Sequence, residues 1–134
     1  MIKIEQLESV TTKAVEEINA LLAQLSTSGV QVSYGSLLEV LRDPAATVFV
    51  VKDGAAIVGV GMLVTFHNLG GKRGRLEDIV IHESHRGQGL GEKMCQKIIE
   101  YAREQKVNRI TLTSKPARVA ANKLYHKLGF ELQE

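Results

Sequence analysis

A run of glycines between a strand pattern and a helix pattern constrains this chain more than any other feature. The run reads RGQGLG over residues 86–91; it follows the β-branched segment 76–81 and opens an amphipathic pattern that continues to about residue 105. Glycine lets the backbone approach a ligand closely, and the N-terminus of a helix adds about half a positive charge. A strand, a glycine loop and a helix in this order predict an α/β layer structure with a phosphate-binding loop.

Two common phosphate-binding loops do not fit this sequence. A Walker P-loop needs Lys and then Ser or Thr after its last glycine, whereas Gly91 is followed by Glu92 and Lys93. A dinucleotide fingerprint needs a third glycine three residues after the second, and counting from Gly87 and Gly89 that position is Glu92. The loop is therefore not expected to hold ATP or NAD.

The remaining pattern predicts the element order β-α-α-β-β-β-α-β-α-β in one domain, residues 1–134. Period-two and β-branched segments indicate strands, and apolar residues recurring every three or four positions indicate helices. Strands are expected at 3–7, 48–51, 56–64, 76–81, 109–113 and after Phe130, and helices at 12–25, 36–42, 89–105 and 117–128. Asp53-Gly54 predicts a hairpin turn, residues 65–75 with their glycines are expected to form a loop, and Gly129 is expected to end the last helix.

Composition excludes several classes of protein. The net charge of +2 is too balanced for a dedicated nucleic-acid binder, and a single cysteine allows neither an intramolecular disulfide nor a thiolate metal cluster. The longest apolar stretches fall short of the roughly 20 residues of a membrane span. The first residues lack the apolar core of a secretory signal, so a cytoplasmic location is expected.

Three segments together resemble the GNAT superfamily of N-acetyltransferases. They are the R-x-x-G-x-G pattern formed by Arg86, Gly89 and Gly91, the longer segment LEDIVIHESHRGQGLG at 76–91, and AANKLYHKLGF at 120–130. The resemblance also covers the order of elements over most of the chain. It implies the GNAT acyltransferase fold, a central, twisted, mostly antiparallel sheet with helices on both faces, and acetyl-CoA as the cofactor.

The resemblance also implies which residues bind that cofactor. The backbone N–H groups of the loop would hold the CoA pyrophosphate, and the strand Ile79-Val80-Ile81 would pair through its backbone with the pantetheine arm. Asn122 would hydrogen-bond the same arm. The loop residues concerned are Arg86, Gly87, Gln88, Gly89, Leu90 and Gly91.

Acetyl transfer to an amine requires a base, because a free alkylammonium with a pKa near ~10 is almost wholly charged at neutral pH. Glu77, at the start of the strand beside the loop, is the candidate base, since the family often has a carboxylate there. In a regular strand Asp78 would point to the opposite face, and a bulge would reverse that assignment. The resemblance implies Tyr125 as the acid for the departing thiolate, because the family commonly has a tyrosine near the thioester sulfur. Tyr125 is three residues after Asn122, so both are expected on one helical face.

Other reactive residues fit less specific roles. His82 and His85 are three apart in a predicted loop, which does not match the zinc pattern HExxH, so no metal is expected. Cys95 lies beside the apolar stripe of the long helix and is expected to be a buried structural thiol. Lys72, Arg73 and Arg75 form a basic cluster, interpreted as a solvated loop or as a site for an acidic substrate or the 3′-phosphate of CoA.

The function predicted from these features is acetyl transfer from acetyl-CoA to a primary amine of a small molecule or peptide. A non-catalytic CoA-binding sensor or partner module is the alternative. The segment LEDIVI is similar to aminosugar-phosphate acetyltransferases, although it occurs in many small family members. Family members usually continue beyond the position of Phe130 into a further strand that completes the sheet, so that strand is missing here or supplied by a partner subunit, and a homodimer is a hypothesis.

Overall fold

A computed structural model describes residues 1–24, 30–113 and 131–133 of the chain. The strands are β1 (Ile2–Gln6), β2 (Ala46–Asp53), β3 (Ala56–Asn68), β4 (Gly71–Ile81), β5 (Arg109–Thr113) and β6 (Glu131–Gln133). The helices are α1 (Thr12–Leu22), α2 (Tyr34–Arg42) and α3 (Leu90–Glu104), and a short 3₁₀ turn, η1 (Glu83–His85), lies between β4 and α3. The predicted helix 117–128 and its cap Gly129 lie outside the described residues.

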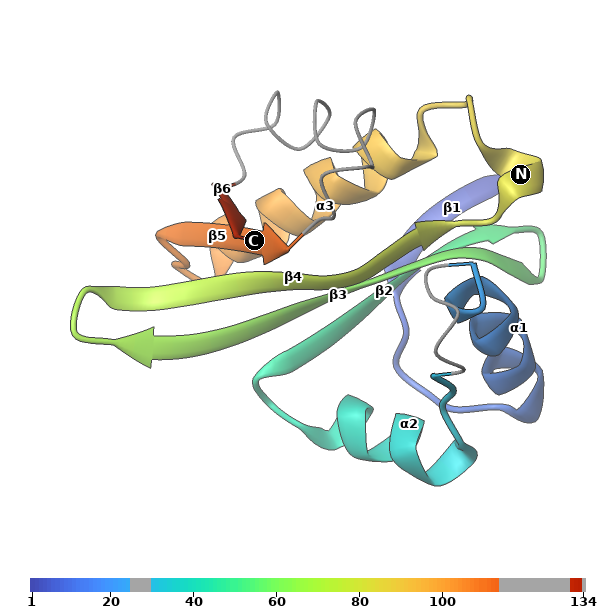
Figure 1. Ribbon diagram of the computed structural model, residues 1–134, viewed down its shortest axis with the longest axis horizontal. Helices are drawn as coiled ribbons and strands as arrows, with labels where there is room; N and C mark the ends of the chain where they lie inside the picture. The colour runs from blue at the N-terminus through green and yellow to red at the C-terminus, as the bar shows by residue number, and fades with distance from the viewer. Residues whose placement is uncertain (25–29, 114–130, 134) are drawn as a thin grey trace.

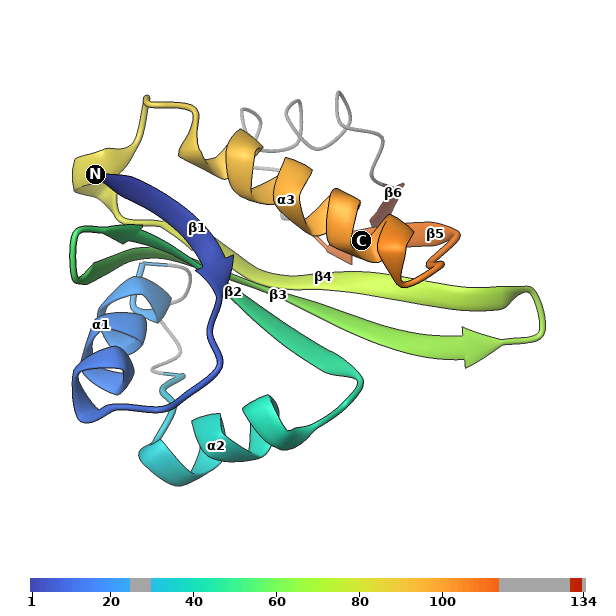
Figure 2. The same ribbon diagram turned by 180° about the vertical axis from the view of Figure 1, so that it is seen from behind.

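The strands form one six-stranded sheet whose spatial order follows the order in the chain. β1 to β4 are antiparallel to one another, whereas β5 runs parallel to β4 and β6 runs parallel to β5. Helix α3 covers one face of the sheet, and α1 and α2 cover the other (Figure 1 and, from behind, Figure 2). The predicted mixed α/β fold, a mostly antiparallel sheet with helices on both faces, is confirmed.

Burial of both faces produces two hydrophobic cores. The helical stripe predicted from the sequence, Leu90, Met94, Ile98 and Ala102, is buried and packs on the sheet with Cys95. On the opposite face Ile18 and Leu21 of α1 and Leu37 of α2 pack against β2 and β3. The alternation along β2 explains the division, because Phe49 and Val51 belong to the first core while Val48 and Val50 belong to the second.

The prediction of a loop over residues 65–75 is wrong. β3 extends to Asn68 and β4 begins at Gly71, so the two strands form a long hairpin that projects past the ends of its neighbours (Figure 1). The buried Gly74 is an interior strand residue: a Cβ there would lie 3.0 Å from Leu63 and 3.2 Å from Val107. The basic cluster 72–75 therefore lies on a strand.

Helix α2 begins two residues before the predicted start because Ser33 and Ser36 cap it. The Ser33 hydroxyl accepts from the Ser36 amide at 3.0 Å, and the Ser36 hydroxyl accepts from the Ser33 amide at 2.8 Å. This reciprocal pair satisfies two donors at the helix start. None of the helices among the described residues is long and apolar enough to cross a membrane.

Candidate active site

The glycine loop opens directly into the N-terminus of α3. Gly87 and Gly89 have positive φ angles of 81° and 74°, a backbone region that other residues rarely adopt. Gly89 is the N-cap and, lacking a side chain, provides no capping hydrogen bond. The first helical hydrogen bond runs from the Lys93 amide to the Gly89 carbonyl, so the amides of Leu90 and Gly91 precede it. Amides in this position, together with the helix dipole, are donors for an anion.

Space around the loop is open. A Cβ placed on Gly87 or on Gly89 would meet no atom within 4 Å among the described residues. The glycines are therefore required by backbone conformation and not by neighbouring protein atoms. A loop of this shape can admit a phosphate close to its main chain, which is the property that a CoA pyrophosphate requires.

Beside the loop, β4 loses its strand neighbour on one side. β5 pairs with β4 only from Arg73 to Leu76, opposite Arg109 to Leu112, while β4 continues to Ile81. Along 77–81 no strand of the described ranges pairs with β4 on that side. Backbone N–H and C=O groups at such an edge can pair with an extended, amide-bearing ligand. Ile79, Val80 and Ile81, predicted to contact pantetheine, lie on this stretch.

A bulge interrupts β4 just after its pairing with β5 ends. Val60 pairs with Val80 and Met62 pairs with Glu77, so two residues of β4 stand opposite Gly61. One of the two, Asp78, has a positive φ of 55°, a strained conformation for a residue with a side chain.

Two glycines of β3 make room for β4 at this point. A Cβ on Gly61 would lie 2.3 Å from the Ile79 Cδ1 atom, and a Cβ on Gly59 would lie 2.7 Å from the Ile81 Cδ1 atom. The two isoleucine side chains therefore cover the space above the two glycines. Larger residues in β3 would displace the part of β4 that faces the loop.

The two carboxylates at the bulge differ in environment. Glu77 pairs with Met62, which packs on the α1 and α2 face, and its Oε1 lies 3.9 Å from the Arg75 Nε atom. Asp78 is an exposed residue overall, yet partial burial of its carboxyl raises its pKa above the ordinary value. The sequence analysis left a bulge open as the alternative to regular alternation, and the structure has that bulge, with Asp78 as one of its two residues. Both carboxylates belong to residues of the stretch 77–81, along which no described strand pairs with β4 on that side.

Two residues of the basic cluster, Arg73 and Arg75, have different partners on β4. The Arg75 guanidinium lies 6.0 Å from the Phe66 ring centre, a cation–π contact, and beside Glu77. Arg73 donates to the Asn108 Oδ1 atom at 2.9 Å. Arg75 is therefore the basic residue that the structure brings next to the candidate base.

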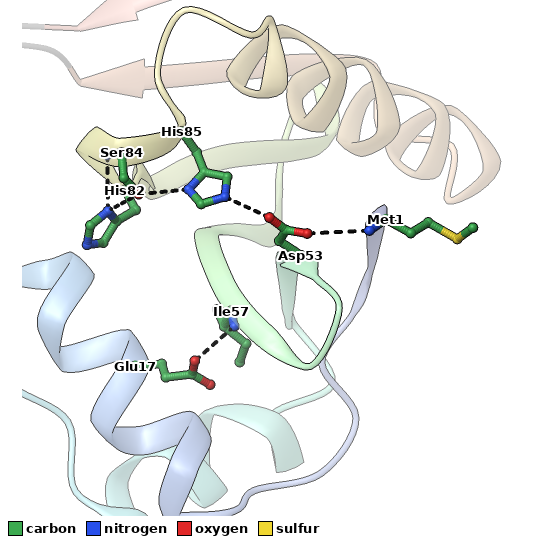
Figure 3. Close-up of polar contacts among 7 residues, drawn as sticks. All are labelled: Met1, Glu17, Asp53, Ile57, His82, Ser84 and His85. Carbon is green, nitrogen blue, oxygen red and sulfur yellow. Dashed lines mark hydrogen bonds and ion pairs between the residues drawn. The ribbon is translucent and has the colours of Figure 1, made fainter.

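A chain of polar contacts joins the start of the glycine loop to the β2–β3 turn (Figure 3). His82 and His85 both contact the Ser84 hydroxyl, and the His85 Nε2 atom lies 2.9 Å from Asp53 Oδ2. The sequence analysis did not anticipate this network, since Asp53 was interpreted only as a turn residue. Close spacing of His82, Ser84 and His85 was visible, but their partner is 32 residues away.

Cys95 has no chemistry available to it in the folded protein. Its side chain is completely buried, and burial, followed by the negative charge of Glu92, raises the pKa of the thiol to about 12. A nucleophilic cysteine needs an exposed thiolate. Across the described part of the chain, no group of three or more His, Cys, Asp or Glu side chains could hold a metal ion. Asn122 and Tyr125 lie outside the described residues.

Among the described residues, an uncapped helix N-terminus, an open glycine loop and a strand edge without a partner lie together, an arrangement that suits an extended ligand with phosphates. The sequence model of the Acetyltransferase (GNAT) family matches residues 13–130. The chain therefore belongs to the GNAT acetyltransferase family.

Individual relatives agree with this membership. The chain is 29% identical over 130 residues to a rice protein named "Probable glucosamine 6-phosphate N-acetyltransferase 2", covering 95% of this chain and 70% of that protein. It is 31% identical over 87 residues to the Bacillus subtilis "Uncharacterized N-acetyltransferase YobR", covering 65% of this chain and 34% of the relative. The matched region thus spans about a third of the length of the bacterial relative.

Solved structures share the fold over almost the whole chain. A protein described as a transcriptional regulator from Bacillus halodurans superposes with a TM-score of 0.84 at 27% identity, covering 98% of this chain and 93% of that chain. Glucosamine-6-phosphate N-acetyltransferase from Arabidopsis thaliana superposes with a TM-score of 0.82 at 22% identity, covering 100% and 94%. A predicted acetyltransferase from Clostridium acetobutylicum, determined with acetyl-CoA, has a TM-score of 0.75 at 14% identity, covering 100% and 92%.

Proposed function

We propose that this protein transfers the acetyl group of acetyl-CoA to a primary amine of a small molecule or peptide, by direct attack within a ternary complex. The observation that carries the proposal is the open, uncapped N-terminus of α3 lying beside the unpaired edge of β4. In this arrangement one end of the site accepts phosphates and the adjoining strand edge accepts an amide-bearing arm. Family membership supports acetyl-CoA as the ligand.

The loop residues bind and orient the cofactor in this proposal. Backbone amides within Arg86–Gly91 hold the pyrophosphate, and the Ile79–Ile81 backbone pairs with pantetheine. Asn122 adds a side-chain hydrogen bond to the same arm. A thioester held at the bulge then lies where backbone N–H groups of 79–81 can stabilise the oxyanion.

Glu77 accepts the proton that the acceptor amine must lose, directly or through water. The amine nitrogen forms a bond to the acetyl carbon, the bond from that carbon to sulfur breaks, and Tyr125 protonates the departing thiolate. Tyrosine and thiol have ordinary pKa values near ~10 and ~8.5, so the site must stabilise phenolate or desolvate thiolate for this transfer to be complete.

The acceptor is proposed only as a primary amine. The names of similar proteins extend from glucosamine 6-phosphate acetyltransferase to ribosomal-protein-alanine acetyltransferase, which are a sugar phosphate enzyme and a protein enzyme. Arg75 beside Glu77 supports an acceptor with an anionic group among the small molecules to be tested.

A titration calorimeter and a thiol-release assay test the proposal. Acetyl-CoA should bind to the purified chain, and at least one amine in a panel of aminosugars, aminosugar phosphates, polyamines and peptide N-termini should release free CoA. Failure to bind acetyl-CoA contradicts the proposal at its first step.

The Tyr125→Phe variant tests the acid. It should retain acetyl-CoA affinity while the transfer rate falls by about 10²-fold or more, the range for a positioned proton donor. A variant with unchanged turnover would remove Tyr125 from the mechanism and leave the cofactor site intact.

A CoA-binding sensor without turnover is the second candidate. The Bacillus halodurans structure described as a transcriptional regulator favours it, because that chain shares the fold over 98% of this one. Binding of acetyl-CoA without thiol release from any amine would support the sensor over the enzyme.

A further inference from the structure

The segment that leads into the glycine loop is tied to a distant turn by a continuous series of short contacts (Figure 3). The Ser84 Oγ atom lies 2.7 Å from His82 Nδ1 and 2.8 Å from His85 Nδ1. The other ring nitrogen of His85, Nε2, lies 2.9 Å from Oδ2 of Asp53, the last residue of β2 before the turn into β3. Asp53 thereby reaches the residue immediately before Arg86, where the loop starts.

Counting protons determines the charge that this series requires. The His82 Nδ1 atom accepts the Ser84 amide at 3.1 Å, so this nitrogen carries no proton. The Ser84 hydroxyl must then donate its proton to His82 Nδ1, because this nitrogen has no proton of its own to donate to Ser84 Oγ. His85 must donate from Nδ1 to Ser84 and from Nε2 to Asp53. Only the imidazolium form of His85 has both protons.

This arrangement differs from a hydrolytic triad in its polarity. A triad needs a neutral histidine that takes the serine proton. Here the Ser84 hydroxyl donates to His82 and accepts from His85, so His85 has no free lone pair for it. The network is suited to holding two segments together.

Further charged groups face the same turn. The amino group of Met1 lies 3.4 Å from Asp53 Oδ1, and Lys13 of α1 donates to the Ala55 carbonyl. Glu83 lies on η1 itself, and Arg86 donates to the Ile81 carbonyl and to Gln24. Within this set Asp53 is the carboxylate in contact with His85. The hydrogen bond from His85, and then the amino group of Met1, hold the pKa of Asp53 below its usual range.

The loop itself has few means of fixing its conformation. A Cβ on either Gly87 or Gly89 would meet no described atom within 4 Å, and both residues have the backbone freedom of glycine. The side chain of Arg86 makes only exposed contacts. Order must therefore come from the two ends of the loop, α3 on one side and η1 on the other.

We infer that Asp53 and His85 are positioning residues that hold η1, and through it the start of the glycine loop, in the conformation that binds the cofactor pyrophosphate. The inference depends on the proposed function of that loop. Loss of either side chain breaks the series of contacts between the end of β2 and Ser84. Cofactor binding should then weaken.

The Asp53→Asn variant separates positioning from simple charge. Asp53 is the last residue of β2 and the turn itself is Gly54-Ala55, so asparagine, which has nearly the same shape, should retain the hairpin. Removing a negative charge near a phosphate site should tighten binding by Coulomb's law alone. If Asp53 positions the loop, CoA affinity should instead fall about three- to fivefold, the value of an exposed charge-assisted contact. Glu83→Gln removes an equal charge from η1 itself and should leave affinity unchanged or higher.

Measuring CoA binding by a second variant completes the test. His85→Gln removes the other partner of the contact and should weaken CoA binding by about three- to fivefold, as Asp53→Asn does. Equal or tighter CoA binding by Asp53→Asn overturns the inference.

Hydrogen exchange of the 86–91 amides without CoA gives a second readout. Exchange should be about three- to fivefold faster in Asp53→Asn than in Glu83→Gln, in keeping with the loss of one exposed contact. Equal exchange in the two variants also overturns the inference. If the wild-type chain fails to bind CoA, the proposed function fails, while this exchange measurement still decides whether Asp53 orders the loop.

Discussion

Single residues at this site act mainly through what they lack. Gly87 and Gly89 have no side chain and a positive φ, and both leave the approach to the α3 amides open. Asp78 has a side chain in the same unfavourable region of backbone conformation, at the bulge beside the candidate base. Such strain is typical of positions that function requires.

A charge placed at Gly89 should weaken cofactor binding by on the order of a hundredfold. For a carboxylate at Gly89→Asp and a phosphate about 5 Å apart, the repulsion costs about 3 kcal/mol at an effective dielectric constant of 20. Gly89→Asn is the matched control, since asparagine tolerates positive φ equally well and has nearly the same shape. Calorimetry should show a much smaller loss for Asn; equal losses would mean that shape and not charge excludes the phosphate.

Comparing Glu77→Gln with Asp78→Asn should identify the base. Loss of a positioned base lowers the rate about 10²- to 10⁴-fold, and we expect this for Glu77→Gln with acetyl-CoA affinity retained. Asp78→Asn should have a small effect on rate. The raised pKa of Asp78 means that its ionised form is disfavoured in the folded state, so this variant should also be slightly more stable above pH 4. A large rate loss in Asp78→Asn alone would transfer the role to Asp78.

At the scale of elements, the sequence predicts local patterns well and long-range contacts poorly. The stripe of α3 follows from spacing alone, and Leu90, Met94, Ile98 and Ala102 are all buried. The start of β4 does not follow from the sequence pattern, because Gly70, Gly71 and Gly74 are typical of a loop. Only contacts distant in sequence, such as Leu63 and Val107 against Gly74, require a glycine inside that strand. The bulge at Asp78 likewise depends on register with β3.

The candidate site shows the same division. The loop 86–91 and its helix are recognisable from residue types and order, because glycine spacing and helix periodicity are local properties. The contact between Asp53 and His85 is not recognisable in this way, because it spans 32 positions and two isolated polar residues form no pattern. Nor does the sequence reveal that the pairing of β4 with β5 ends at Leu76, because this depends on where β5 diverges from β4.

The bulge should be sensitive to a methyl group on β3. In Gly61→Ala the new Cβ would stand 2.3 Å from Ile79 Cδ1 and 3.3 Å from Met94 Cε, and overpacking of this kind costs about 1 to 3 kcal/mol. The same change in α2, Gly35→Ala, meets only an atom 3.9 Å away and should stabilise the chain by up to about 1 kcal/mol. Urea unfolding should therefore give a lower free energy of unfolding for Gly61→Ala and a higher one for Gly35→Ala, each relative to the wild-type chain.

A double variant checks the cause. Ile79→Val removes the Cδ1 atom and should restore part of the stability lost in Gly61→Ala. No recovery would show that the cost lies elsewhere than in this contact.

At the scale of the whole molecule, the β1 side of the sheet should weaken in acid. Lys52 lies 3.0 Å from Glu5, and this hydrogen bond is the main cause of the lowered pKa of Glu5. A carboxylate whose pKa is lower in the folded than in the unfolded state contributes stability above its unfolded value, and loses it as the pH falls through the folded value. Between pH 5 and pH 3 the wild-type chain should therefore lose more thermal stability than Glu5→Gln. An equal loss in both would contradict this assignment.

The assembly state stays a prediction. β6 pairs with β5 within the chain, so a strand after Phe130 does join the sheet, although it comprises only Glu131–Gln133. Light scattering should detect a homodimer if a partner extends this edge, and a monomer at working concentrations rejects it.

The burial of Cys95 has a practical consequence for measuring this chemistry. It is the one cysteine of the 134-residue sequence, and its thiol has a pKa of about 12. A disulfide reagent that colours on contact with free sulfhydryls will therefore report liberated coenzyme with no background from the native polypeptide. Without coenzyme, the rate at which the same reagent modifies Cys95 reports the rate of global unfolding, because modification can proceed only after α3 separates from the sheet.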